Sequence, residues 1–516
     1  MRTALRCAAV FVAATGMTAP SLAQSAPTAA PKPVSPFVLC DGRTGHVSGG
    51  LRLFRALAVM GTLGVSELGT TKDDDSKRAK GKDGAAACTT ALAQEQNGER
   101  RVELVIAKTV HFLEDNDLDQ ALTTIRTAEE AAGAYKTDTG FRRTLLPRAI
   151  LLESIVLVRA KRFAEAEARA VEAVRLGAYD VALAQRARVL LALTTELGTA
   201  KRHALTQVAR IMPINVVSET MAMTEAGRYA EAAAANADYI DLAKASLRKF
   251  VPADFEATQS ALLALAGDLD GSKQFRERAE SGIAAMQSTG ESAARASIIA
   301  SASETLTLQS LIVDLKQGKG SDARATFRAH GPWLLTNRGL IFAAMQQLQA
   351  GAPASELTGN LGESAAAWRE RKLAEFATTL TTEDFVKSLY GLALANASAE
   401  EFAKAGRVTW TTGKKPKFLL PPDKKDPPPF EIMSTITMAS VSGLPSGEAL
   451  LLQAGLIARE RGLDGVALIP VRQTIDLMGV RFGKIGTPGF PESLTFRADK
   501  LVADLSPVIP RPTPGN

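Results

Sequence analysis

Apolar residues recur at three- and four-residue intervals over most of residues 85–410, and glycine, proline or polar clusters separate the runs. This spacing places the apolar side chains on one face of a helix. Pro213, Pro252, Pro332 and Pro353 all fall between runs, where proline can begin or end a helix. The pattern therefore predicts an almost wholly helical region over 85–410, without strands.

Alanine occupies the predicted buried face of several of these helices. In three stretches a large residue is followed, at offsets of 3, 7 and 10, by residues of the same helix face. The residues are Leu118, Ala121, Ile125 and Ala128; Phe163, Ala166, Ala170 and Ala173; and Tyr229, Ala232, Asn236 and Tyr239. Each stretch follows a polar turn and an earlier apolar helix, so the predicted unit is a helix, a tight turn and a second helix. Alanine lets the two axes approach toward the close end of the usual ~8–10 Å range, and such pairs must stack on one another to bury their faces.

The order of turn, large residue and alanine resembles the tetratricopeptide repeats of exported bacterial proteins. ACTTALAQEQNGERRVELVIAKTVHFLEDNDLDQALTTIRTA, residues 87–128, is the closest match, and the resemblance extends to residue 178 and returns over 218–243. It weakens where Ser272 replaces alanine and Gly320 replaces the large residue. The resemblance implies a mostly α fold, a helical solenoid that binds a protein or peptide without catalysis or a cofactor. An amphipathic helical bundle with an alanine-rich core is the alternative.

The spacing of the units departs from that family. The alanines at 121, 166, 232 and 323 are 45, 66 and 91 residues apart. Tandem tetratricopeptide units recur at about 34 residues. Extra helices or degenerate units are therefore expected between the recognisable ones.

The N-terminus has the layout of a secretory signal. A basic start, an apolar centre and small residues before Gln24 predict a signal peptide over 1–23 that is cleaved after Ala23. The predicted product is periplasmic, and an uncleaved membrane anchor is the alternative. A Pro/Ala-rich linker is expected over 24–36.

Residues 37–84 are expected to form a cap helix near Phe54 and a charged loop. Without the leader, the chain keeps two cysteines, Cys40 and Cys88. In an oxidising compartment an even cysteine count predicts a disulfide, which would fasten the cap helix onto the first repeat. Unrelated free thiols are the alternative.

The composition changes after residue 410. Clustered proline and lysine predict an interdomain linker over 411–430, and a small α+β domain with the order β-α-β-β-α is expected over 431–510, before a tail at 511–516. Its predicted elements are a strand around Ile436 and Met438, a helix from an N-cap at Ser446 to Gly462, a buried strand over 465–471, a strand with a bulge at Gly479, and a helix over 498–506.

Charge and motifs exclude several functions. The 61 basic and 55 acidic residues are interspersed, so no nucleic-acid footprint is predicted. His46, His111, His203 and His330 show no metal-ligand spacing with the cysteines, and no phosphate-binding loop or nucleophile elbow occurs. The C-terminal carboxylates, such as Glu448, are expected to be solvated.

The sequence thus favours a periplasmic, non-catalytic scaffold or adaptor that binds a protein or peptide, with the small domain as a second docking surface. Two alternatives stay open. One is an envelope-associated module that contacts peptidoglycan or membrane through the lysine-bearing linker or the C-terminal domain. The other is an enzyme with an unrecognised site.

Overall fold

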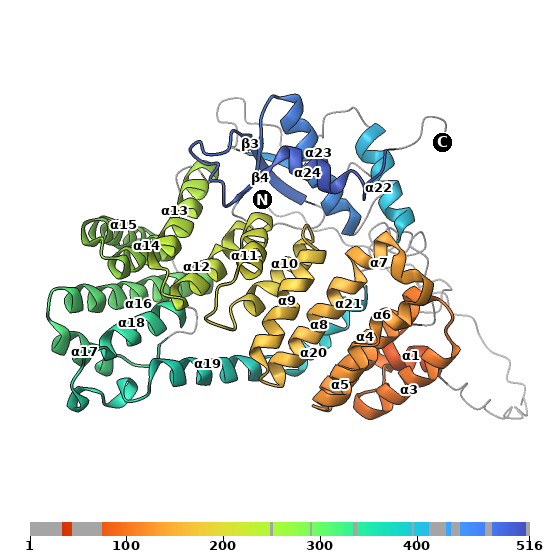
Figure 1. The fold of residues 1–516 in the computed structure, drawn as a ribbon, viewed down its shortest axis with the longest axis horizontal. Helices are drawn as coiled ribbons and strands as arrows, with labels where there is room; N and C mark the ends of the chain where they lie inside the picture. The colour runs from red at the N-terminus through yellow and green to blue at the C-terminus, as the bar shows by residue number, and fades with distance from the viewer. Residues whose placement is uncertain are drawn as a thin grey trace, which may run out of the picture. The chain divides into compact units, whose positions relative to one another are not determined.

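The computed structural model describes residues 34–43, 75–247, 251–288, 292–333, 338–394, 397–411, 430–434, 444–469 and 477–511 (Figure 1). The described helices and strands lie within one compact unit, Pro36–Asn516. Several predicted segments lie outside the described residues. They are the signal peptide, most of the 24–36 linker, the cap helix near Phe54, nearly all of the 411–430 linker, the strand around Ile436 and Met438, and most of the tail.

Helices make up most of the described chain. The first are α1 (Pro36–Asp41), α3 (Gly81–Gln94), α4 (Gly98–Glu114), α5 (Leu118–Ile125), α6 (Ala128–Ala132), α7 (Thr139–Arg143), α8 (Leu145–Arg159), α9 (Phe163–Leu176), α10 (Val181–Ala187) and α11 (Thr199–Ile211). They are followed by α12 (Val216–Glu225), α13 (Tyr229–Ser246), α14 (Ala253–Ala266), α15 (Leu269–Ser288), α16 (Ala293–Lys316), α17 (Gly320–Ala329), α18 (Arg338–Gln349), α19 (Ala365–Thr379), α20 (Glu383–Leu389), α21 (Gly391–Leu394) and α22 (Ala399–Thr411). Short 3₁₀ turns include η3 (Arg188–Leu191) and η4 (Pro213–Asn215).

Five pairs of consecutive helices among the described residues share one turn geometry. The pairs are α4–α5, α8–α9, α12–α13, α14–α15 and α16–α17, and the turn of each contains one residue with positive φ: Asn116, Lys161, Gly227, Gly267 and Gly318. The N–H of that residue bonds the carbonyl three residues earlier, and the next N–H bonds the carbonyl five residues earlier, at N···O distances of 2.8–3.2 Å. This is the Schellman arrangement, which satisfies the last carbonyls of the first helix and reverses the chain.

Counting from the positive-φ residue puts all five pairs in one register. Five residues later, the side chain is small and fully buried in every pair: Ala121, Ala166, Ala232, Ser272 and Ala323 are each 0% exposed. The stretches with Ser272 and Gly320, which match the predicted pattern weakly, therefore build the same hairpin as the others. Serine is small enough for the close contact, and the residue beside the turn need not be large.

Hydroxyl groups mark the place where the two helices of a hairpin approach. Ser154 Oγ of α8 donates to the carbonyl of Ala166 in α9 at 2.6 Å. Ser260 Oγ of α14 donates to the carbonyl of Ser272 in α15 at 2.7 Å. Each hydroxyl lies seven residues before the positive-φ residue of its hairpin. Only a small residue opposite leaves the partner backbone within reach of such a short side chain.

The hairpins pack on their neighbours in chain order. α5 contacts α8, α9 contacts α11, α13 contacts α14, and α14 contacts α16. α18 then packs on both α12 and α16, as the adjacent ribbons show (Figure 1). After the last hairpin, the chain thus returns to pack against α12 and α16, which are first helices of two hairpins.

The C-terminal strands form one antiparallel sheet in the order β1-β3-β2-β4. The strands are β1 (Glu431–Ser434), β2 (Gly465–Leu468), β3 (Leu477–Gly483) and β4 (Thr495–Arg497), and the helices are α23 (Leu444–Glu460) and α24 (Ala498–Leu505). The predicted β-α-β-β-α order omits β4, whose three residues are too few to show an alternating pattern. The helix α23 begins at Leu444, so Ser446 lies in its first turn and is not the N-cap.

Gly479 does not form the predicted bulge. It pairs regularly with Ile432 of β1, and its carbonyl accepts a hydrogen bond from the N–H of Ile469. A Cβ atom at this position would lie 2.3 Å from Cδ1 of Ile469, so a larger residue would displace that side chain. The interpretation as a bulge failed because Met478 and Val480 share one buried face on either side of Gly479, and both are at most 1% exposed.

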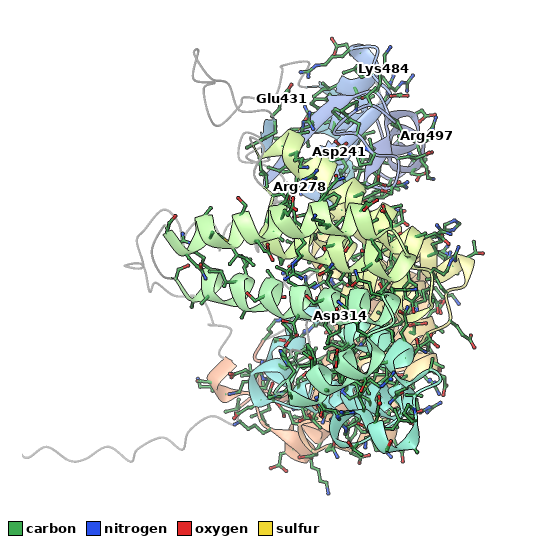
Figure 2. The ribbon with its side chains drawn as sticks, turned by 90° about the vertical axis from the view of Figure 1, so that its left-hand side faces the viewer. Asp241, Arg278, Asp314, Glu431, Lys484 and Arg497 are labelled. Atoms are coloured by element: carbon green, nitrogen blue, oxygen red, sulfur yellow. A yellow bond between two sulfur atoms is a disulfide. The ribbon has the colours of Figure 1, made fainter. Side chains whose placement is uncertain are left out.

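The sheet and its helices pack on the helical hairpins. Leu450 and Leu501 belong to the same apolar core as helical residues such as Leu104. Polar contacts join the two parts as well: Arg143 Nη2 lies 2.8 Å from Glu448 Oε1, and the backbone N–H of Gly489 donates to Asp241 of α13, which Figure 2 shows beside the sheet. Glu448 is 5% exposed, so the expectation that it is solvated is wrong: an arginine from a segment some 300 residues away pairs with it.

Candidate functional site

The predicted repeat-packing residues lie inside the hairpins. Ala121, Ala166, Ala173 and Ala232 are 0% exposed, and Ala128 is 3% exposed. The large residues beside the turns are partly buried and pack against the core: Leu118, Phe163 and Tyr229. None of these residues lines the pocket described below.

Cys40 and Cys88 form a disulfide, with their Cα atoms 4.6 Å apart. Both cysteines are fully buried, and the bond links α1 to α3. The carbonyl of Cys40 lies 2.6 Å from Nε2 of His111 in α4. The described segment that the bond fastens is therefore α1, and it is tied to α3, the helix that packs on α4 of the first hairpin.

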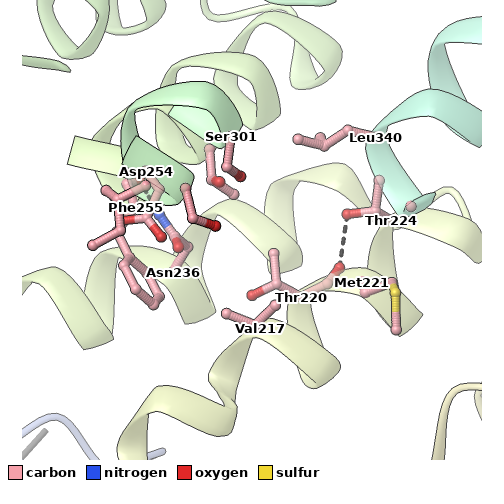
Figure 3. A pocket seen from close by; sticks show the side chains of 13 residues that line it. Val217, Thr220, Met221, Thr224, Asn236, Asp254, Phe255, Ser301 and Leu340 are labelled. Carbon is pink, nitrogen blue, oxygen red and sulfur yellow. Dashed lines mark hydrogen bonds between the residues drawn. The ribbon is translucent and has the colours of Figure 1, made fainter. Parts of the chain in front are cut away.

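A pocket of about 230 Å³ lies among α12, α13, α14, α16 and α18 (Figure 3). Its lining combines apolar residues with hydroxyl, amide and carboxyl groups: Val217, Thr220, Met221, Thr224, Asn236, Asp254, Phe255, Thr258, Ser297, Ile298, Ser301, Gly339 and Leu340. In Figure 3, Asn236, Asp254 and Phe255 lie on one side of the pocket, and Thr224, Met221 and Leu340 lie on the other. A Cβ atom at Gly339 would lie 3.0 Å from Cγ of Met221, so glycine lets α18 close the pocket against α12.

Two buried polar atoms of the lining have no hydrogen-bond partner. They are Oγ1 of Thr220 and Oδ1 of Asp254. Thr220 occupies the hairpin position of Ser154 and Ser260, seven residues before Gly227, but it does not bond the second helix. A buried polar group without a partner costs about 1–3 kcal/mol, and a ligand that supplied the missing bonds would recover part of that cost.

The amide of Asn236 offers the pocket an acceptor. Its nitrogen donates to the carbonyl of Phe255 at 3.0 Å and to Oε1 of Gln259 at 2.8 Å. Both of its N–H bonds are thus directed away from a ligand, and Oδ1 is the atom left to accept.

Asp254 is the one charged residue of the lining. Burial raises the pKa of its carboxyl above the ordinary value, and the backbone N–H groups of Asp254 and Phe255 only partly offset this. No side-chain cation contributes to the pKa of this carboxyl. The carboxylate therefore lacks the compensating charge that buried acids usually have.

A buried carboxylate that does have charged partners lies at the end of α12, the helix that carries Thr220. Glu225 is 4% exposed, and each carboxylate oxygen takes one arginine: Arg338 Nε at 2.9 Å from Oε1, and Arg369 Nε at 2.6 Å from Oε2. Arg338 also donates to the carbonyl of Ala192 at 2.6 Å. Arg338 directly precedes Gly339 of the pocket, but its guanidinium is committed to Glu225 and Ala192.

Nothing in the described residues gathers three or more histidine, cysteine, aspartate or glutamate side chains in a geometry that could hold a metal ion. His111 is fully buried, and its ring nitrogens lie near the carbonyl of Cys40 and the hydroxyl of Tyr390. The contacts of His111 join α1, α4 and the end of α20, which is a packing role.

Sequence reasoning missed Thr220 and Asp254. Thr220 could have been found from the hairpin register, because hydroxyl residues recur seven positions before the turn. No local pattern marks Asp254, since its neighbours in the pocket come from helices that are distant in the sequence.

Comparison with known proteins gives no relative: no family model, curated protein or solved structure matches the chain. One described segment, Arg295–Lys316 of α16, is long and apolar enough to cross a membrane, with a mean hydropathy of 1.3. Core helices meet the same criterion, and α16 packs against α14, α17 and α18.

Proposed function

We propose that this chain is an exported, non-catalytic adaptor whose stacked helical hairpins bind a protein or peptide, in the manner of tetratricopeptide-like solenoids. One observation carries the proposal: α12, α14 and α16, the first helices of successive hairpins, together with α18, line one pocket. Repeat proteins use surfaces built from equivalent elements of adjacent units to bind extended ligands. The Cys40–Cys88 bond supports export, because disulfides persist in oxidising compartments.

Site-specific photo-crosslinking tests the binding role. A photoreactive residue at Val217, which lines the pocket and is 46% exposed, should give discrete protein adducts in the native host. The same residue at Ala168, an exposed position on α9, is the control. Adducts of equal yield at both positions, or none at Val217, would contradict the proposal.

Intact mass tests the export. Protein from a native exporting host should begin at Gln24, because the small residues before it favour cleavage after Ala23. Full-length protein in the cytosolic fraction would show that the chain is not exported.

A further inference from the structure

The pocket lining includes three groups that can accept hydrogen bonds, and one of them carries a negative charge. Asp254 Oδ1 is buried without a partner, and Asn236 presents its carbonyl oxygen because its amide nitrogen is already engaged. Thr220 adds a hydroxyl that can accept or donate. Such a set is complementary to a cation with several N–H donors, and it repels an anion.

The pocket size suits a side chain. Whole small-molecule sites usually measure about 300–1,000 Å³, whereas this pocket measures about 230 Å³. Phe255, Met221 and Leu340 line it with apolar surface against which an aliphatic stem can pack. Lysine and arginine combine such a stem with a cationic head.

Exposed apolar side chains lie on elements beside the pocket. Large apolar side chains that are exposed in the described chain include Val189, Ile214 and Val217, at 40%, 38% and 46%. They lie on η3, η4 and α12, and both 3₁₀ turns contact α12. Val217 also lines the pocket, so exposed apolar surface reaches the pocket at this residue.

From this juxtaposition we infer that the pocket receives a lysine or arginine side chain of an extended partner segment, whose neighbouring aliphatic residues lie over Val189, Ile214 and Val217. The inference rests on the proposed function and specifies the partner's chemistry. Asp254 pairs with the cationic head, Asn236 and Thr220 accept further N–H bonds, and the apolar walls enclose the stem.

A peptide selection tests the inference. The mature chain is incubated with random nine-residue peptides, acetylated and amidated so that no terminal charge contributes, and bound peptides are sequenced by mass spectrometry. The expected result is enrichment of lysine or arginine at one position with aliphatic residues nearby. Replacing that basic residue by methionine in the best peptide should weaken its Kd at least tenfold.

Matched variants locate the binding. Asp254→Asn should weaken the Kd of the same peptide at least tenfold, because it removes the charge and keeps the shape. Asp270→Asn makes the same charge change at an exposed position of α15 and should leave the Kd unchanged. Thr220→Val should weaken binding severalfold while raising the melting temperature, so weaker binding cannot be attributed to unfolding.

The outcomes separate this inference from the proposed function. Enriched peptides without a basic residue, or equal affinity for the parent protein and Asp254→Asn, would overturn the inference and leave peptide binding intact. If no peptide is enriched, the inference is also overturned, and crosslinking at Val217 decides the proposed function independently.

Discussion

The hairpins α8–α9 and α12–α13 follow one plan, yet the hydroxyl at the same position is used differently in each. Ser154 donates to the backbone of α9, whereas Thr220 has no partner and lines the pocket. The alanines opposite them, Ala166 and Ala232, are equally buried. The comparison teaches that the pocket does not require a change of fold: one hydrogen bond within a hairpin is left unmade, and the hydroxyl faces a cavity.

The two carboxylates near α12 show the same contrast. Glu225 of α12 has an arginine on each carboxylate oxygen. Asp254 of α14 has one buried carboxylate oxygen without a partner. Paired buried charges hold elements in place, and removing one partner is costly. An unpaired buried polar atom destabilises the folded state, and a ligand that bonds this atom removes part of the penalty. The following changes test whether these groups behave as differently in solution.

The largest effect is expected at Glu225. Glu225→Gln leaves Arg338 and Arg369 buried without their counter-charge, so the free energy of unfolding should fall by about 3–5 kcal/mol. Glu231→Gln is the matched control, since its side chain is 38% exposed and pairs with exposed arginines. That control should change stability by less than about 1 kcal/mol. Urea unfolding followed by circular dichroism measures both, and equal losses would mean that the buried triad contributes no more than a surface pair.

The second-largest effect is expected at the close contact between the two helices of a hairpin. Ala166→Leu must force α8 and α9 apart, because Ala166 is 0% exposed and its carbonyl is bonded to Ser154. We expect a loss of about 1–3 kcal/mol. Ala168→Leu on the exposed face of the same helix should change stability by no more than about 0.5 kcal/mol. Similar melting temperatures for the two variants would contradict the hairpin geometry.

The hairpins could be predicted from sequence because their signals are local. The run from Phe163 to Ala173 lies on one helix, and glycine marks the turn at Gly227. Lys161 also adopts positive φ, although nothing in its residue type indicates this, so that turn was placed by its polar residues between two apolar runs. Gly320 lacks the large residue of the pattern, yet its hairpin forms because Ala323 still supplies the close contact.

The pocket could not be predicted, because it depends on contacts between distant segments. Arg338 and Arg369 reach Glu225 across 113 and 144 residues. These contacts bring α18 and α19 back to α12, and only then does Leu340 form a wall of the pocket. Likewise, no periodicity indicates that Glu448 is buried against Arg143.

A smaller effect, of opposite sign in the two hairpins, is expected at the hydroxyl position. Ser154→Ala removes a buried hydrogen bond and should destabilise the protein by about 0.5–1.5 kcal/mol. Thr220→Val replaces a hydroxyl without a partner by a methyl group of the same shape, so it should stabilise the protein, by up to about 1 kcal/mol. Denaturant midpoints of both variants at equal slope give the two signs. A loss of stability in both would mean that Thr220 is bonded within its hairpin after all.

The smallest effect is a pH-dependent one at Asp254. Burial raises the pKa of this carboxyl above its ordinary value of 3.8, so its ionised form destabilises the fold at neutral pH. As the pH falls through the raised pKa toward the ordinary value, the folded state gains a proton and this cost disappears. Tyr239, the titratable group whose pKa Asp254 affects, is neutral throughout this range.

Asp254→Asn should therefore be slightly more stable than the parent protein at about pH 7, and the difference should shrink toward about pH 4. Asp270→Asn, at an exposed position, should show no such convergence in the same urea series. A less stable Asn variant at neutral pH would mean that the Asp254 carboxylate already has a charged partner within the fold. The contrast with Glu225 would then fail, and so would the argument that this carboxylate awaits a cation.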